Sequence, residues 1–153
     1  MSDSEETVVF DLDGTLADIT NRMNLSLKSN GKIDWTKFFN PENIRLDLPN
    51  MKVIRMAKIL KSKGFKIFIF SGRSDQTKEA TEKWLEKHDI PFDLLKMRPM
   101  GDNIKDSILK ENWLREVFDS PDDIFAVFDD RQQVVDMWRS YGIQVFQVAE
   151  GNF

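Results

Sequence analysis

The 153-residue sequence contains no cysteine and only one histidine, and it has no apolar run of the roughly 20 residues that cross a bilayer as a helix. Without cysteine, disulfides and thiolate-bound metals are excluded. The first six residues are polar and acidic, unlike a secretory signal. We therefore expect no membrane partner, and the cytoplasm is the default location.

Positive charge is also scarce. Lys and Arg together number 22 against 26 Asp and Glu, which gives a net charge of -4. Proteins that bind the phosphate backbone over a long stretch collect Lys and Arg on one face. The composition thus argues against an extended nucleic-acid-binding surface, but it leaves open the binding of a strand end or a single nucleotide.

The overall composition and length indicate a globular protein. Charged residues make up 31% of the chain and hydrophobic residues 41%, a composition that is neither disordered nor membrane-like. A domain of this length buries about 68 to 70% of the surface that its unfolded chain exposes. We predict a single domain over residues 1–153.

Apolar runs alternate with segments of helical spacing. The runs that predict buried strands are 8–10, 67–70, 92–95, 124–128 and 143–148. The first predicted helix begins at Pro49 and ends before Gly64, and the other three cover 77–88, 104–118 and 132–141. This alternation predicts an α/β fold, a Rossmann-like three-layer arrangement in which helices cover both faces of a parallel sheet.

Residues 16–48 interrupt the alternation directly after the first strand. They show no convincing second strand, but they contain enough apolar side chains for a small helical cap over the strand tips. Three aromatic residues, Trp35, Phe38 and Phe39, belong to this insertion. They could stack on a base, although closing the cap's own core is the simpler expectation.

The most informative segment is Asp11-Leu12-Asp13-Gly14-Thr15, which follows the apolar run at 8–10. Residues two apart on a strand point to the same side, so both carboxylates would project from the strand tip. Two like charges this close need a cation or a shared proton. A divalent metal with a phosphorylated substrate is the first interpretation; a polar turn is the simpler alternative.

Each of the next three predicted strands also ends in polar residues. Ser71-Gly72-Arg73 follows the second strand, Arg98 the third, and Asp129-Asp130-Arg131 the fourth. Ligands of open parallel sheets bind outside the carboxyl ends of the strands. We therefore expect these side chains to converge on one rim.

The order DLDGT, an apolar strand ending in SGR, a lysine on a later helix and then FDD resembles the four motifs of the haloacid dehalogenase superfamily of aspartyl-phosphate phosphatases. The resemblance spans essentially the whole chain. Within the superfamily, the segments 129–139 and 147–153 are similar to the C-terminus of the 3′-phosphatase domain of phage polynucleotide kinase/phosphatase enzymes. After Arg22, residues 23–48 do not follow that pattern.

The resemblance implies four catalytic residues. Asp11 would attack phosphorus as the nucleophile, and Asp13 would protonate the leaving oxygen and later accept a proton from water, a role for which we expect a raised pKa. Ser71 would donate a hydrogen bond to a phosphoryl oxygen. Both Lys105 and Lys110 could balance the phosphoryl charge, and the family pattern favours Lys110.

The resemblance also implies Mg²⁺ as the cofactor, which suits a hard site built from oxygen ligands. The ligands would be Asp11, the backbone carbonyl of Asp13, and Asp130. Asp129 would either orient a metal-bound water or hold the lysine, and the order of Asp129 and Asp130 stays open. A solvated acidic turn is the alternative for this pair.

On the substrate side, the candidates are Arg22, Arg73 and Arg98, where the family pattern also has arginine, together with Gly72 and Asp106. A planar guanidinium suits bidentate contact with phosphate, and a glycine lets the backbone approach closely. Asp106 lies one helical turn before Lys110 and could pair with it. An ordinary surface ion pair is the alternative for Asp106.

The implied function is a Mg²⁺-dependent phosphomonoesterase that removes the 3′-phosphate of a polynucleotide or nucleotide. A small-molecule phosphatase for 5′-nucleotides or sugar phosphates is the alternative, and a phosphate-binding or receiver-like signalling domain is the non-enzyme alternative. The 153 residues contain no G-x-x-x-x-G-K-[ST] loop. We therefore expect a phosphatase without its own kinase domain, compatible with a separate kinase partner.

Overall fold

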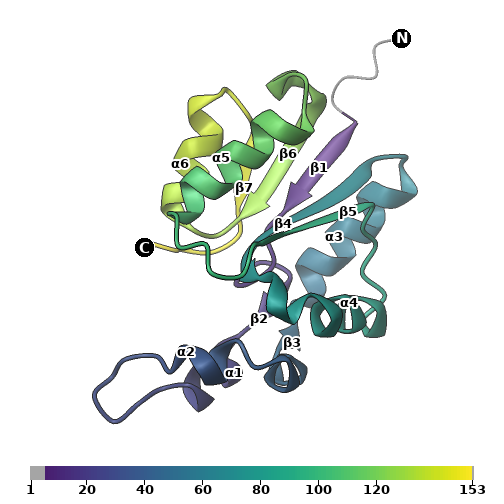
Figure 1. Cartoon of the computed structure of the whole chain (residues 1–153). Helices are drawn as coiled ribbons and strands as arrows, with labels where there is room; N and C mark the ends of the chain where they lie inside the picture. Colours follow the sequence, from purple (N-terminus) through teal and green to yellow (C-terminus); the bar gives the residue numbers. More distant parts are fainter. Residues whose placement is uncertain (1–5, 153) are drawn as a thin grey trace.

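The computed structural model describes residues 6–152, and a five-stranded parallel sheet lies at its centre (Figure 1). Its strands are β1 (Thr7–Phe10), β4 (Lys66–Ser74), β5 (Leu94–Arg98), β6 (Ile124–Asp129) and β7 (Val145–Gln147). The helices that flank it are α3 (Met51–Ser62), α4 (Lys78–Lys87), α5 (Asp106–Val117) and α6 (Gln132–Ser140). The predicted Rossmann-like α/β fold is confirmed.

The strand order β5-β4-β1-β6-β7 places β1 in the middle of the sheet. After β1 the chain builds the sheet outward through β4 and β5, then crosses to the other side and adds β6 and β7. Short single turns, η2 (Asp75–Thr77) and η3 (Pro121–Asp123), precede α4 and β6. The order therefore reverses at β1, and a crevice outside its carboxyl end is the expected ligand site.

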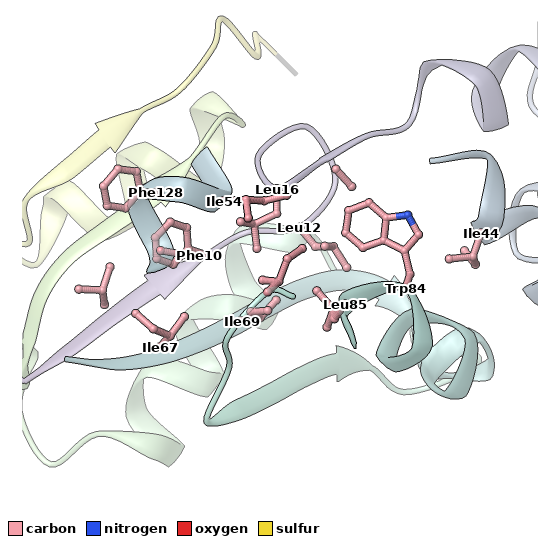
Figure 2. Close-up of a cluster of buried hydrophobic side chains, with 14 residues drawn as sticks. Phe10, Leu12, Leu16, Ile44, Ile54, Ile67, Ile69, Trp84, Leu85 and Phe128 are labelled. Carbon is pink, nitrogen blue, oxygen red and sulfur yellow. The ribbon is translucent and has the colours of Figure 1, made fainter. Parts of the chain in front are cut away.

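Alternation along β1 divides the core between the two faces of the sheet. Val8 and Phe10 pack with α3 and α4, whereas Val9 packs with α5 and α6. Figure 2 shows the first of these clusters, in which Phe10 lies against Phe128 with ring centroids 4.7 Å apart. Burial on both faces explains why the strands read as continuous apolar runs.

The insertion after β1 forms a cap at the end of the sheet to which the β1 and β6 arrows point (Figure 1). It contains β2 (Ala17–Asp18), α1 (Thr20–Leu25), α2 (Trp35–Phe38), η1 (Pro41–Leu46) and β3 (Leu48–Pro49). Strands β2 and β3 pair antiparallel at its base. The prediction had no strand here, because two-residue strands are too short to show a period.

A buried contact joins the cap to the sheet domain. Ile44 of η1 is 1% exposed and belongs to the same core cluster as Trp84 of α4, near which it lies in Figure 2. The indole nitrogen of Trp84 also donates to the carbonyl oxygen of Asp47, at 3.0 Å. The cap is thus fixed to helix α4 as well as to the end of β1.

Several predicted boundaries are wrong. Strand β4 continues to Ser74, not only to 70, β5 begins at Leu94, not at 92, and β7 covers Val145–Gln147, not 143–148. Just before β5, Asp93 accepts a hydrogen bond on its carboxylate from the backbone N–H of Ile67, at 2.8 Å. Pro49 pairs in β3, and α3 starts at Met51. Among the described residues, no helix is both long and apolar enough to cross a membrane.

Candidate active site

The tip of β1 turns sharply after its last paired residue. The backbone N–H of Asp11 still donates to the carbonyl of Phe128 on β6, at 2.9 Å, and Gly14 then takes a φ of +84°, which favours glycine. A Cβ on Gly14 would lie 2.2 Å from Oδ2 of Asp130. A glycine is therefore required here for two reasons: the turn needs a positive φ, and the Asp130 carboxylate leaves no room for a side chain.

Three buried carboxylates converge at this tip. Asp11, Asp129 and Asp130 each place an oxygen within 4.8 Å of the others. Burial, and then the negative charge of Asp129, raises the pKa of Asp11 well above its usual value. Like charges this close favour a bound cation, and an all-oxygen donor set suits a hard divalent ion.

Lys110 of α5 supplies the one cation inside this cluster that the described residues show. Its Nζ atom lies 2.9 Å from Oδ1 of Asp11 and 3.0 Å from Oδ2 of Asp129, and the residue is 1% exposed. Burial acts to lower the pKa of Lys110, but the carboxylates of Asp11, Asp129 and Asp106 outweigh it and raise the pKa well above its usual value. Lys110 therefore stays charged in the interior.

The two neighbouring aspartates differ in their surroundings. Both oxygens of Asp129 are engaged, Oδ2 by Lys110 and Oδ1 by the backbone N–H of Arg131 at 3.1 Å. Asp130 accepts a hydrogen bond from Thr15, at 3.3 Å, and lines the cavity described below. Of the two arrangements left open for Asp129, the structure has the one in which it holds the lysine.

Asp13 points to a pair of arginines. Its Oδ1 accepts a short hydrogen bond from Nη2 of Arg73 and a second from Nη2 of Arg22, at 3.3 Å. Burial acts to raise the pKa of Asp13, but Arg73 and Arg22 outweigh it and lower the pKa below its usual value. The expectation of a raised pKa is wrong for this arrangement, because two guanidinium charges reach one carboxylate.

Asp47 was not singled out by the sequence, yet it anchors both arginines. Its Oδ1 accepts from Nε of Arg22 at 2.9 Å, its Oδ2 accepts from Nη2 of Arg73 at 3.0 Å, and its side chain is fully buried. Burial raises the pKa of Asp47 although the two guanidiniums act against it. The only signal in the sequence was an acidic residue between two leucines of the insertion.

Residues from β4, β5 and α5 form the wall beside the acidic cluster. Gly72 approaches Asp106 so closely that a Cβ would lie 2.3 Å from Oδ1. Nε of Arg98 donates to the carbonyl of Gly72 at 2.9 Å, and its Nη2 lies 3.6 Å from Asp106. Ser71 is 1% exposed, and its Oγ accepts from the N–H of Arg73 at 3.1 Å.

A cavity of about 260 Å³ opens above these residues. Its lining comes from the strand tips, the wall and the cap: Asp11, Asp13, Trp35, Phe38, Phe39, Gly72, Arg73, Arg98, Asp106, Asp130 and Arg131. Most of the predicted site residues therefore meet at one opening. Four predicted residues, Arg22, Ser71, Lys110 and Asp129, do not line it and lie behind the residues that do.

The cap aromatics are not equivalent. Phe38 is 7% exposed, and the Arg22 guanidinium lies over its ring, 4.3 Å from the centroid, so it belongs to the interior of the cap as expected. Trp35 is 58% exposed and lines the cavity. For Trp35 the expectation of a role in the cap's own core is wrong.

This geometry suits phosphoryl transfer. A buried carboxylate, Asp11, faces the cavity beside a second carboxylate that two arginines position, and Arg73, Arg98 and Arg131 line the opening. Such an arrangement offers a nucleophile, a proton-transfer group and charge stabilisation within one site. Neutral substrates would gain little from it.

Comparison with known proteins points the same way. The family model described as the polynucleotide kinase PNKP phosphatase domain matches residues 5–153. A protein of Autographa californica nuclear polyhedrosis virus with the provisional name bifunctional polynucleotide kinase/RNA ligase is 36% identical over 146 residues, which cover 93% of this chain and 19% of that protein.

Solved structures agree in fold. A chain of the Pnkp1/Rnl/Hen1 complex is 35% identical, with a TM-score of 0.78 over 96% of this chain and 47% of that chain. A haloacid dehalogenase-like hydrolase from Streptococcus pneumoniae is 15% identical, with a TM-score of 0.69 over 94% of this chain and 84% of that one. The chain spans about a fifth of its viral relative and about half of the complex chain.

Proposed function

We propose that this chain, which belongs to the family of polynucleotide kinase phosphatase domains within the haloacid dehalogenase superfamily, acts as a 3′-phosphatase. Its family makes it a phosphoric monoester hydrolase. The 3′-phosphate that it removes would come from the end of a polynucleotide or from a nucleotide. The reaction would pass through an aspartyl-phosphate on Asp11. The observation that supports this best is the buried Asp11 carboxylate, which faces the same cavity as Asp13 while Lys110 holds one of its oxygens.

In the first displacement an oxygen of Asp11 forms a bond to phosphorus, and the bond from phosphorus to the 3′-oxygen breaks. Asp13 gives its proton to that leaving oxygen. In the free protein two guanidiniums lower the pKa of Asp13, so it needs an added negative charge nearby to become protonated. The dianionic phosphoryl group in the cavity supplies that charge and raises the pKa on binding.

In the second displacement Asp13, now a carboxylate, takes a proton from water as the water oxygen attacks phosphorus. The bond from phosphorus to Asp11 breaks, and inorganic phosphate leaves with Asp11 restored. Lys110 stays beside the Asp11 oxygen in both steps, 2.9 Å away in the free protein. It offsets negative charge inside a buried site, where electrostatic interactions are strong.

Mg²⁺ is the cofactor we propose for the acidic cluster. Asp11, Asp130 and the backbone carbonyl of Asp13 would bind it, with Asp129 holding Lys110 next to it. When bound, the ion would neutralise phosphoryl oxygens and balance the carboxylates. Haloacid dehalogenase phosphatases generally use Mg²⁺, which agrees with the oxygen-only donor set.

The proposal is tested with a panel of phosphate esters in the presence of Mg²⁺. We expect 3′-phosphorylated oligonucleotides and 3′-mononucleotides to be hydrolysed with a higher kcat/KM than 5′-mononucleotides and sugar phosphates. Asp11→Asn should abolish every one of these activities, since an amide is a poor nucleophile. Faster hydrolysis of sugar phosphates or 5′-nucleotides would replace the proposal with the small-molecule alternative.

A further inference from the structure

A second cavity, of about 550 Å³, adjoins the catalytic one and has no role in the reaction described above. It lies between the cap aromatics Trp35 and Phe39 and the loop 99–105 that leads into α5. Five residues line both cavities: Trp35, Phe39, Arg98, Asp106 and Arg131. The two cavities are therefore neighbours, and a group attached to a phosphate in the first cavity can extend into the second.

The lining offers an aromatic surface that the fold does not need to bury. Trp35 is 58% exposed, and its ring stacks on Phe39 with centroids 5.5 Å apart and an interplanar angle of 21°. Phe38 meets the same indole edge-on at 5.4 Å. Two rings thus fix the orientation of the indole while more than half of the residue stays accessible, which is the arrangement of a stacking platform.

The charge of this cavity is opposite to that of the chain as a whole. Its lining contains the basic residues Arg98, Lys105 and Arg131 and the acidic residues Asp102 and Asp106, while the whole chain carries -4. Within residues 6–152, Lys105 is exposed and forms no ion pair. An anionic ligand with an aromatic group fits this combination, and a neutral or cationic one does not.

We infer that the second cavity binds the terminal nucleobase of a single-stranded 3′-phosphorylated polynucleotide, with the base stacked on Trp35 and the next phosphodiester near Lys105. The inference rests on the proposed function, since it places the 3′-phosphate of the same nucleotide in the catalytic cavity. Stacking tolerates any base. The cap therefore selects for a nucleotide over a sugar phosphate without reading the sequence.

A cycle that changes the protein and the ligand separately tests this inference. Trp35→Ala should lower kcat/KM for a 3′-phosphorylated oligonucleotide by about 5- to 150-fold, the value of one stacked base. For the same oligonucleotide with an abasic terminal sugar, the change should stay within about twofold. Trp35→Phe should recover most of the loss, because a phenyl ring can still stack.

The matched control is Phe125→Ala, which removes another exposed aromatic ring. Phe125 is 44% exposed and lies near the amino end of β6, away from the strand tips. It should leave kcat/KM unchanged for both oligonucleotides. An equal loss on the base-bearing and the abasic substrate in Trp35→Ala would assign Trp35 a structural role, and no loss on either would also overturn the inference.

A binding experiment separates this inference from the proposed function. The other three tryptophans, Trp84, Trp113 and Trp138, are 5% exposed or less. A ligand on the surface can therefore quench the fluorescence of Trp35 by direct contact, but not that of the other three. Titration of the inactive Asp11→Asn variant with the 3′-phosphorylated oligonucleotide should quench this emission, and the abasic oligonucleotide should quench it much less.

Equal quenching by the two oligonucleotides would refute the subsite even if wild-type protein hydrolyses both. Base-dependent quenching by an oligonucleotide that wild-type protein does not hydrolyse would instead uphold the subsite and refute the proposed 3′-phosphatase activity.

Discussion

Asp13 at the tip of β1 and Asp47 in the cap accept hydrogen bonds from the same nitrogen, Nη2 of Arg73. Arg22 repeats the connection, with Nη2 on Asp13 and Nε on Asp47. The residue proposed to transfer the proton is thus held in place through arginines that a cap residue anchors. Cap and reaction centre are parts of one buried network.

We predict that Asp47→Asn lowers both stability and turnover. Removing one charge from a buried ionic network leaves guanidiniums with too few acceptors, which costs about 3 to 5 kcal/mol. Urea unfolding should show this loss. The kcat should fall for oligonucleotide and small esters alike, because the network positions Asp13 and not the nucleotide. Unchanged kcat with a normal unfolding midpoint would contradict a positioning role.

Asp93→Asn is the matched stability control, since Asp93 pairs with Lys61 at 2.7 Å on the surface. We expect a cost of about 1 kcal/mol and unchanged kcat. Burial acts to raise the pKa of Asp93, but the bonds from Lys61 and the N–H of Ile67 lower it. The difference in the free energy of unfolding between wild type and Asp93→Asn should therefore reach its full size above the pKa of Asp93 in the unfolded chain, about 3.9. It should vanish as the pH falls through the lower pKa of Asp93 in the folded protein.

Asp13→Asn should separate binding from turnover. An amide cannot donate or accept the proton, so kcat should fall by about 10²- to 10⁴-fold. The KM should rise little, because Arg98 and the Lys110 region stay in place. Steady-state kinetics with a 3′-phosphorylated oligonucleotide measure both values. A normal kcat would remove Asp13 from the proton-transfer step.

Exhaustive chelation should abolish activity, and added Mg²⁺ should restore it. Calorimetric titration of the chelated protein should give an affinity for Mg²⁺ that Asp130→Asn weakens at least about tenfold, since a direct ligand matters at least as much as an outer one. Asp136→Asn, on the exposed side of α6, is the control and should bind Mg²⁺ normally. Activity that survives chelation would contradict the metal assignment.

The fold was predictable from the sequence wherever a strand or helix is long enough to show an apolar run or a helical repeat. All five strands of the main sheet and four helices produce runs or stripes in the sequence, and the residues after Phe10 and Phe128 mark their strand tips. The pair β2–β3 was not predictable, because two residues show no pattern.

Contacts between distant segments were equally hidden. Nothing local indicates that Asp47 reaches Arg22 and Arg73, or that Trp35 stays exposed while Phe38 is buried. Such choices depend on how the cap docks on α4. Residue types at strand tips therefore predicted which side chains meet, but not which of them line the cavity and which support it from behind.

The central claim is that Asp11 takes the phosphoryl group before water does. The most direct test is the configuration at phosphorus after hydrolysis of an isotopically chiral 3′-phosphorothioate oligonucleotide. Each in-line displacement inverts phosphorus, so attack by Asp11 followed by attack by water predicts overall retention. Overall inversion would show that water attacks the substrate directly and would contradict the covalent intermediate on Asp11.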